Sequence, residues 1–184
     1  MNWMPAQQEG RIKALEALLA HYRAKYPLAE PSGKVNETSL RVADGVVNHV
    51  FQWGPYEPAQ YEQDLRWDWD PRGDIEWVAA IYRFYWTEPL EQAYRETRDE
   101  KYPKAYVDLT RDWIAKHPLE EHAKTHYVYD RWRGFAWLDI ETGLRATRLC
   151  PSFPVMVHAD EFTPDFLGLL LASLYDPLVK TEKP

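Results

Sequence analysis

Apolar residues along this chain recur at spacings of three and four, and this period constrains the fold more than any other feature. Between residues 11 and 26 they are Ile12, Leu15, Leu18, Leu19 and Tyr22. Side chains at these spacings share one face of an α-helix, whereas a half-buried strand needs alternation. The same period returns over 38–51, 100–116 and 131–149, and no strand-like run has convincing length. The sequence therefore predicts an all-α fold of about six or seven helices.

Capping residues and proline divide the middle of the chain. Asp74 is suited to cap a helix that runs to about Arg98. Pro89 lies inside that helix, where it removes one backbone hydrogen bond and clashes with the preceding turn. We therefore expect a kink, or two helices that meet near Thr87. Asp99 is expected to cap the helix that follows.

Similar signals mark the last part of the chain. Pro151 and Pro154 are expected to end the helix over 131–149. The run Thr163-Pro164-Asp165 offers a capping hydroxyl, a proline and an acid in the order that starts a helix, which we expect over 166–175. We expect one domain over 1–184, with a leading helix and linker at 1–39 and a frayed tail at 176–184.

Long loops rich in aromatic residues separate these helices. Tryptophan and tyrosine are frequent, with nine and twelve copies. Residues 52–73 hold Trp53, Tyr56, Trp67 and Trp69 among Pro and Gly, and we expect an ordered surface loop there rather than a short strand. Such rings most often pack in a core, and they also form the stacking walls of sugar sites.

Charge and composition narrow the function classes. The formal net charge of −7 argues against nucleic-acid binding, which needs basic patches. No apolar stretch approaches the length of about 20 residues that spans a membrane. Met1–Gly10 has no apolar core of a secretory signal. Cys150 is the single cysteine, so no intrachain disulfide can form, and we expect a buried structural thiol.

Motifs for metal, nucleotide or nucleophilic chemistry are missing from the sequence. His122 and His126 are four residues apart, as paired metal ligands on a helix would be, but residue 123 is Ala where a zinc peptidase needs Glu. We interpret His117–His126 as a polar surface loop and expect neither a metal nor a cofactor. There is also no Gly-x-Ser-x-Gly elbow and no glycine-rich phosphate loop.

Two kinds of sugar chemistry stay open from the residues alone. Carboxylates Asp68, Asp70, Asp74 and Glu76 lie among tryptophans, and a pair at suitable separation would hydrolyse a glycosidic bond. A lyase that acts on uronates needs instead a group that neutralises the carboxylate and a base that removes the adjacent proton. For those roles the sequence offers arginines and tyrosines in aromatic helices, namely Arg83, Arg133, Arg145, Tyr82 and Tyr85.

Several short motifs resemble the amino-terminal domain of heparinase II/III-type polysaccharide lyases. In order, they are Arg66-Trp-Asp-Trp-Asp-Pro71, Asp74-Ile-Glu-Trp77, Thr97-Arg-Asp-Glu-Lys-Tyr102, Asp112-Trp113, Trp132-Arg133 and Glu141-Thr-Gly-Leu-Arg145. The resemblance covers 40–175, and its order and spacing are more specific than any single piece. The chain departs from the family at Arg98, where a glycine is usual, and at Phe84, where a histidine is frequent.

The resemblance implies an α/α toroid, here incomplete, and β-elimination on an acidic, uronate-containing glycan such as a glycosaminoglycan or alginate. Family members continue into later toroid helices and a β-sandwich that supply the catalytic residues, so we assign no catalytic residue here. The resemblance implies a part of the substrate cleft, for which the candidates are Trp69, Glu76, Trp77, Arg83, Arg133 and Trp137.

The same resemblance sets the expected partners. They are an acidic polysaccharide and either the missing carboxy-terminal toroid and β-sandwich or a second copy of this chain. It also implies a periplasmic or secreted location. The alternative from another class is a stand-alone helical module that binds a glycan or a protein without catalysis.

Overall fold

The computed structural model describes residues 4–34, 36–118, 135–137 and 139–182, and the regular secondary structure of these residues is almost wholly helical. The described residues form seven α-helices: α1 (Met4–Lys25), α2 (Glu37–Val47), α3 (Ile75–Tyr82), α4 (Thr87–Thr97), α5 (Lys101–Lys116), α7 (Asp139–Met156) and α8 (Pro164–Glu182). A short 3-10 helix, η1, covers Phe135–Trp137, and the strands β1 (Val50–Phe51) and β2 (Ala59–Gln60) form a small antiparallel hairpin. The predicted all-α class is confirmed.

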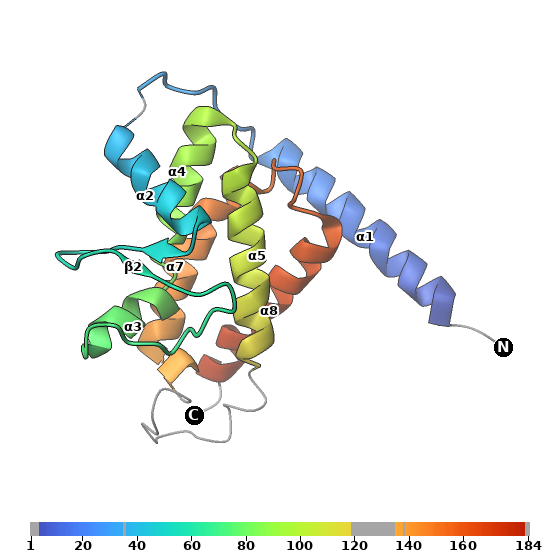
Figure 1. Cartoon of the computed structure of the whole chain (residues 1–184). Coiled ribbons are helices and arrows are strands. Elements are labelled where there is room, and N and C mark those ends of the chain that lie inside the picture. Colours follow the sequence, from blue (N-terminus) through green and yellow to red (C-terminus); the bar gives the residue numbers. More distant parts are fainter. Residues whose placement is uncertain (1–3, 35, 119–134, 138, 183–184) are drawn as a thin grey trace.

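The helices pack around α4, α5 and α7, which lie side by side in the body of the molecule (Figure 1). On one side α2 packs on α4 and α5, and on the other α8 packs on α5 and α7. The core between them is aromatic, with Phe84, Trp86, Tyr106, Trp113 and Phe166 almost fully buried. Rings of this size supply large buried areas, which makes them the main source of packing energy in this fold.

Helix α1 packs on α8 by its second half, while its first half extends away from the body (Figure 1). Arg23 attaches α1 to the turn between α7 and α8, because its Nε donates to Val157 O at 2.6 Å and its NH2 group donates to Ala159 O at 3.0 Å. These bonds join α1 to backbone carbonyls of the turn that follows α7.

The expected break near Thr87 is confirmed. Helix α3 ends at Tyr82 and α4 begins at Thr87, with Phe84 between them in the left-handed region at φ 61°. Pro89 then lies in the first turn of α4, where its missing N–H has no partner to lose. Asp74 caps α3 by accepting from Glu76 N at 3.0 Å, as predicted.

The predicted carboxy-terminal end of α7 was wrong, whereas its predicted start at Arg131 lies outside the described residues. The helix covers Asp139–Met156 and continues through Pro151 and Pro154, which were expected to end it. The carbonyls that lose helical partners there belong to Thr147 and Cys150, which are exposed and can be hydrated. The expectation of a buried Cys150 was also wrong. The thiol is exposed, on the solvent side of α7.

Other helix ends also differ from the sequence prediction. Helix α1 begins at Met4 instead of Arg11, and α2 ends at Val47 because Val50–Phe51 pairs with Ala59–Gln60. Helix α8 starts at Pro164, where the Thr163 hydroxyl caps Phe166 N at 3.2 Å, but it runs to Glu182 instead of ending at Tyr175. None of the described helices has the length and hydropathy to cross a bilayer.

Candidate functional site

The loop between β2 and α3 is held against α3 by a chain of hydrogen bonds that begins at a buried indole. Trp77 donates from Nε1 to the Tyr61 hydroxyl at 2.9 Å, and that hydroxyl donates to Trp69 O at 3.0 Å. The rings of Tyr61 and Trp69 meet edge to face, with centroids 4.8 Å apart. Burial raises the pKa of Tyr61 to about 12, so its hydroxyl stays protonated and keeps donating at neutral pH. Trp69 is thereby fixed in position while part of its ring stays exposed.

A second set of contacts joins this loop and α3 to the loop between β1 and β2. The Tyr56 hydroxyl donates to Asp74 Oδ2 at 2.6 Å, so one carboxylate both caps α3 and anchors the β1–β2 loop. Arg72 donates to Glu57 O at 2.6 Å and lies over the Trp77 ring, 5.3 Å from its centroid. The loop is therefore ordered, as predicted, and no strand forms at Leu65–Trp69.

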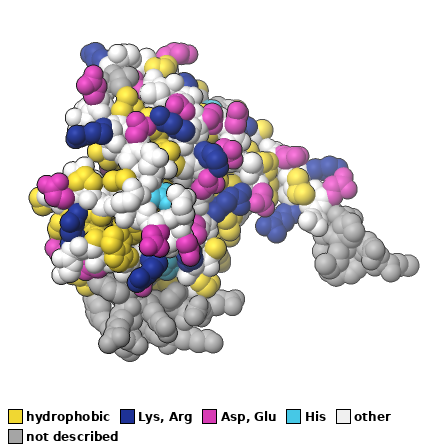
Figure 2. Space-filling view, viewed as in Figure 1, with side chains coloured by type: hydrophobic (Ala, Val, Ile, Leu, Met, Phe, Trp, Pro, Cys, Tyr) yellow, Lys and Arg dark blue, Asp and Glu magenta, His cyan; other side chains and the backbone are white. Residues whose placement is uncertain are grey.

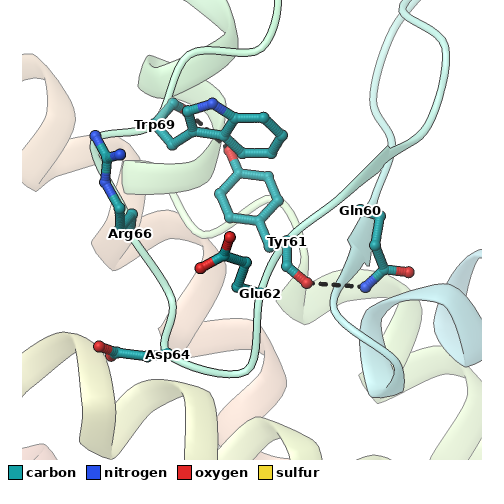
Figure 3. Close-up of a pocket in the computed structure, with 6 residues that line it drawn as sticks. All are labelled: Gln60, Tyr61, Glu62, Asp64, Arg66 and Trp69. Atoms are coloured by element: carbon teal, nitrogen blue, oxygen red, sulfur yellow. Dashed lines mark hydrogen bonds between the residues drawn. The ribbon is translucent and has the colours of Figure 1, made fainter.

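A small pocket opens beside Trp69. It has a volume of about 130 Å³ and is lined by Gln60, Tyr61, Glu62, Asp64, Arg66 and Trp69. Figure 3 shows the rings of Trp69 and Tyr61 on one side, with the Arg66 guanidinium and the Glu62 carboxylate extending beside them. An aromatic wall with a few polar groups around it is an arrangement that suits a sugar ring.

Arg83 lies at the end of α3 within a cluster of carboxylates. Its Nε and NH2 groups donate to both oxygens of Glu141 on α7 at 2.8 Å, and its NH1 group donates to Glu76 at 2.9 Å. The side chain of Arg83 is 13% exposed and that of Glu141 is 1% exposed, whereas that of Glu76 is 62% exposed. Burial acts to lower the pKa of Arg83, but the two carboxylates outweigh it and raise this pKa above its ordinary value. The guanidinium therefore stays charged and joins α3 to α7.

A buried arginine supports this region from within. Arg145 is 3% exposed, donates to Tyr82 O at 3.1 Å and Ala136 O at 3.0 Å, and lies 4.1 Å from the centroid of Trp113. Burial lowers its pKa to about 9, still above neutral. Tyr82 itself is 1% exposed, and burial raises its pKa, so its hydroxyl is placed poorly for removing a proton from a substrate.

The structure brings some of the predicted binding residues together and leaves others inside the core. Trp69 lines the pocket, and Glu76 is exposed beside Arg83. Trp77 and Trp137 are 0% and 2% exposed, so neither has surface to offer a ligand, and Trp77 supports the pocket from below. Arg133 lies outside the described residues.

The other sequence hypotheses have little geometric support. In the described parts of the chain, no three His, Cys, Asp or Glu side chains are placed to hold a metal ion. His122 and His126 lie outside those parts. Asp74, one of the carboxylates considered for hydrolysis, is occupied as a helix cap with a lowered pKa, caused first by the Tyr56 hydroxyl.

Figure 2 shows positive and negative side chains interspersed over one face of the molecule, without a single basic patch. Any attraction for an acidic ligand on this face must therefore come from individual cations.

Sequence reasoning missed Tyr61, Glu62 and Arg66 as pocket residues, and missed the role of Glu141. Arg66 and Glu141 were visible only as members of motifs. The alternation of Leu65, Trp67 and Trp69 did not indicate which ring is accessible, because it places all three on one face, whereas Leu65 and Trp67 are buried and Trp69 is partly exposed. No local signal pairs Arg83 with a residue 58 positions away.

Comparisons with known proteins agree on one group of enzymes. The family model of the heparinase II/III amino terminus matches residues 5–177. Heparin-sulfate lyases of Bacteroides stercoris and Pedobacter heparinus are each 29% identical to this chain, over 91% and 88% of its length. A crystal structure of heparan sulfate lyase from Pedobacter heparinus superposes with a TM-score of 0.81 at 28% identity and covers 94% of this chain. The chain spans 28% and 25% of the lengths of the two curated relatives and 28% of the crystallised one.

Proposed function

The chain belongs to the heparinase II/III amino-terminal family, and from this premise we propose that it forms part of the substrate cleft and scaffold of a lyase. The substrate is an acidic, uronate-containing glycan of the heparan sulfate class, cleaved by β-elimination. The observation that carries this proposal is the close superposition of almost the whole chain on a heparan sulfate lyase.

The pocket beside Trp69 and the exposed edge of the Arg83 cluster are the surfaces that we assign to the glycan. Both are built on α3 and on the loop before it, so Trp77 and Asp74 connect them rigidly. Preorganised groups of this kind lose little freedom when a ligand binds. Glu76 lies at the open side of the cluster, where a glycan hydroxyl can reach its carboxylate.

We propose that this part of the lyase shapes the cleft without supplying the catalytic set. Elimination needs a positioned base and a group that neutralises the uronate. Of the residues considered for those roles, Tyr82 is buried and both Arg83 and Arg145 are engaged within the protein. We therefore expect the purified chain to bind glycans without cleaving them.

The test uses heparan sulfate, hyaluronan and alginate with the purified chain. Binding is followed by tryptophan fluorescence, and elimination by the ultraviolet absorbance of the unsaturated product. Binding of heparan sulfate without product would support the proposal. Turnover that is abolished by Tyr85→Phe in a variant that stays folded would show that a catalytic set lies within this chain.

The alternative is a stand-alone binding module that takes no part in a lyase. The same titration distinguishes a module for a protein partner, since such a module would leave the fluorescence unchanged with all three acidic glycans. A neutral glycan polymer is the matched control for non-specific quenching.

A further inference from the structure

We propose that the pocket beside Trp69 is a subsite for one uncharged sugar ring, an N-acetylhexosamine unit, and that Arg66 at its edge receives the carboxylate of the adjacent uronate. This inference rests on the proposed function and adds which unit of the polymer each side of the pocket recognises. The volume of about 130 Å³ suits a single ring better than a disaccharide.

The aromatic wall is the first support. The Trp69 backbone carbonyl accepts from Tyr61, which holds the backbone in place, and the Tyr61 ring contacts the indole edge to face, so the indole cannot turn away without losing that ring contact. The face of an aromatic ring is electron-rich, and it attracts the slightly positive C–H groups on one side of a pyranose. A fixed indole therefore offers a stacking platform whose ordering cost is already met by the fold.

The carboxylates of the pocket are the second support, because they discriminate by charge. Asp64 is tied to Lys116 at 2.6 Å, which lowers its pKa and partly neutralises it. Glu62 is exposed, and the described residues offer its carboxylate no ion pair. A uronate in the pocket would meet Glu62 with like charge, whereas the hydroxyl and amide groups of an N-acetylhexosamine can donate to it.

Arg66 is the third support. Its side chain is 71% exposed, and its contact with Asp68 is long, 3.9 Å from Nε to Oδ1. A weak exposed ion pair of this kind contributes little to stability, so Arg66 can leave Asp68 and bind another carboxylate. The planar guanidinium can bind a carboxylate through two parallel hydrogen bonds, which suits a uronate placed just outside the pocket. An uncharged ring inside and an acid at the rim match a polymer in which hexosamine and uronate alternate.

A larger groove supplies the control. It lies between α2 and the β1–β2 hairpin, has a volume of about 510 Å³, and is lined by Arg41, Asp44, Asn48 and neighbouring residues. No tryptophan or tyrosine lines it, so it offers no stacking platform. Arg41→Ala therefore removes an exposed arginine from a groove that the proposal does not use.

The experiment uses the whole chain and two oligosaccharides. One is an unsulfated tetrasaccharide of alternating N-acetylglucosamine and glucuronate, and the other is a neutral tetramer of N-acetylglucosamine. Saturation-transfer NMR identifies the sugar protons in contact with the protein, and calorimetry gives the affinities. Circular dichroism confirms that each variant is folded, and Glu62→Gln, which touches no core residue, tests the pocket even where a tryptophan variant fails to fold.

We expect the strongest transfer to N-acetylglucosamine protons. Trp69→Ala should lower the affinity for both oligosaccharides at least about tenfold, while Trp69→Phe keeps part of it. Arg66→Ala should weaken only the acidic tetrasaccharide, and Arg41→Ala neither. Glu62→Gln should reduce the preference for N-acetylglucosamine over glucuronate monosaccharide.

Other outcomes would contradict named parts of the proposal. Transfer centred on glucuronate protons, or full affinity in Trp69→Ala, overturns the subsite while the acidic glycan proposal stands. Trp69-dependent binding of the neutral tetramer alone supports the hexosamine subsite, but it overturns both the role of Arg66 and the proposed acidic substrate. If neither oligosaccharide binds, both inferences fail.

Discussion

Arg83 donates to two carboxylates and has little exposed surface, which makes it a structural residue before it can be a binding residue. Its partner Glu141 is almost completely buried, so the loss of either side chain removes the stabilising effect of the pair. Removing one partner of a buried pair leaves the other charge without compensation, and that costs far more than losing an exposed pair.

We predict that Arg83→Ala lowers the free energy of unfolding by about 3–5 kcal/mol, because Glu141 is left buried and unpaired. Glu76→Gln is the matched control, since it removes only the exposed contact and should cost less than about 1 kcal/mol. Urea denaturation measures both. Equal losses in the two variants would contradict the assignment, and the double variant Arg83→Met with Glu141→Leu should recover much of the stability.

The sequence predicts part of the candidate site. Trp69 was a candidate through the family resemblance, and the structure leaves it partly exposed beside a pocket. Trp77 and Trp137 look equivalent to it in sequence but are buried, because burial depends on what packs from elsewhere. Whether Trp69, Glu76 and Arg83 contact a glycan stays a prediction.

At the scale of helices, periodicity identified most of the elements, and proline gave the largest errors. Pro89 marked a real helix start nearby, whereas Pro151 and Pro154 lie inside α7. The difference is whether the freed carbonyls can reach water and whether the helix has a packed face on both sides of the proline. Leu149 and Met156 provide that face on α7, and sequence alone does not show which face is hydrated.

The end of α4 yields a prediction about backbone strain. Arg98 terminates α4 at φ 59°, in the left-handed region where an L-residue other than glycine costs about 1 kcal/mol or more. Its guanidinium donates to the carbonyls of Ala29, Tyr94 and Arg95, which offsets that strain. Because alanine keeps the strain and loses the bonds, Arg98→Gly should be more stable than Arg98→Ala by about 1 kcal/mol.

Arg95, inside the last turn of the same helix, is the control for this comparison. At a helical position glycine is less stable than alanine by about 0.5–1 kcal/mol, so Arg95→Gly should rank below Arg95→Ala. Thermal unfolding followed by circular dichroism gives both orders. The same ranking at both positions would show that Arg98 is unstrained.

For the whole molecule, one expected partner is a second copy of this chain. Among the described residues, Ile140 and Tyr175 are 60% and 62% exposed, on the helices α7 and α8, which pack on each other. We predict that these side chains belong to an apolar patch through which two copies associate. We expect sedimentation velocity to show concentration-dependent association that Ile140→Lys weakens. A monomer at all concentrations, with no binding of an apolar dye, would exclude this association.

Buried tyrosines make the free energy of unfolding of the whole fold depend on pH in the alkaline range. Burial raises the pKa of Tyr61 and of Tyr94 to about 12, with Glu100 adding to the effect at Tyr94. An unfolded tyrosine ionises near pH 10, so between about pH 10 and 12 the unfolded chain binds fewer protons than the native one. The free energy of unfolding must therefore fall as pH rises through this window, and stay unaffected by these groups below it.

Urea denaturation at about pH 8 and pH 11 measures this loss, and phenolate absorbance of native and unfolded protein locates the two titrations. Tyr61→Phe should flatten part of the pH dependence, because phenylalanine has no proton to release in the unfolded state. It also removes the hydroxyl that joins Trp77 to Trp69, so its stability at pH 8 should already be lower. A native titration that coincides with the unfolded one would mean that these hydroxyls are hydrated, and the rigid support of the Trp69 pocket would lose its physical basis.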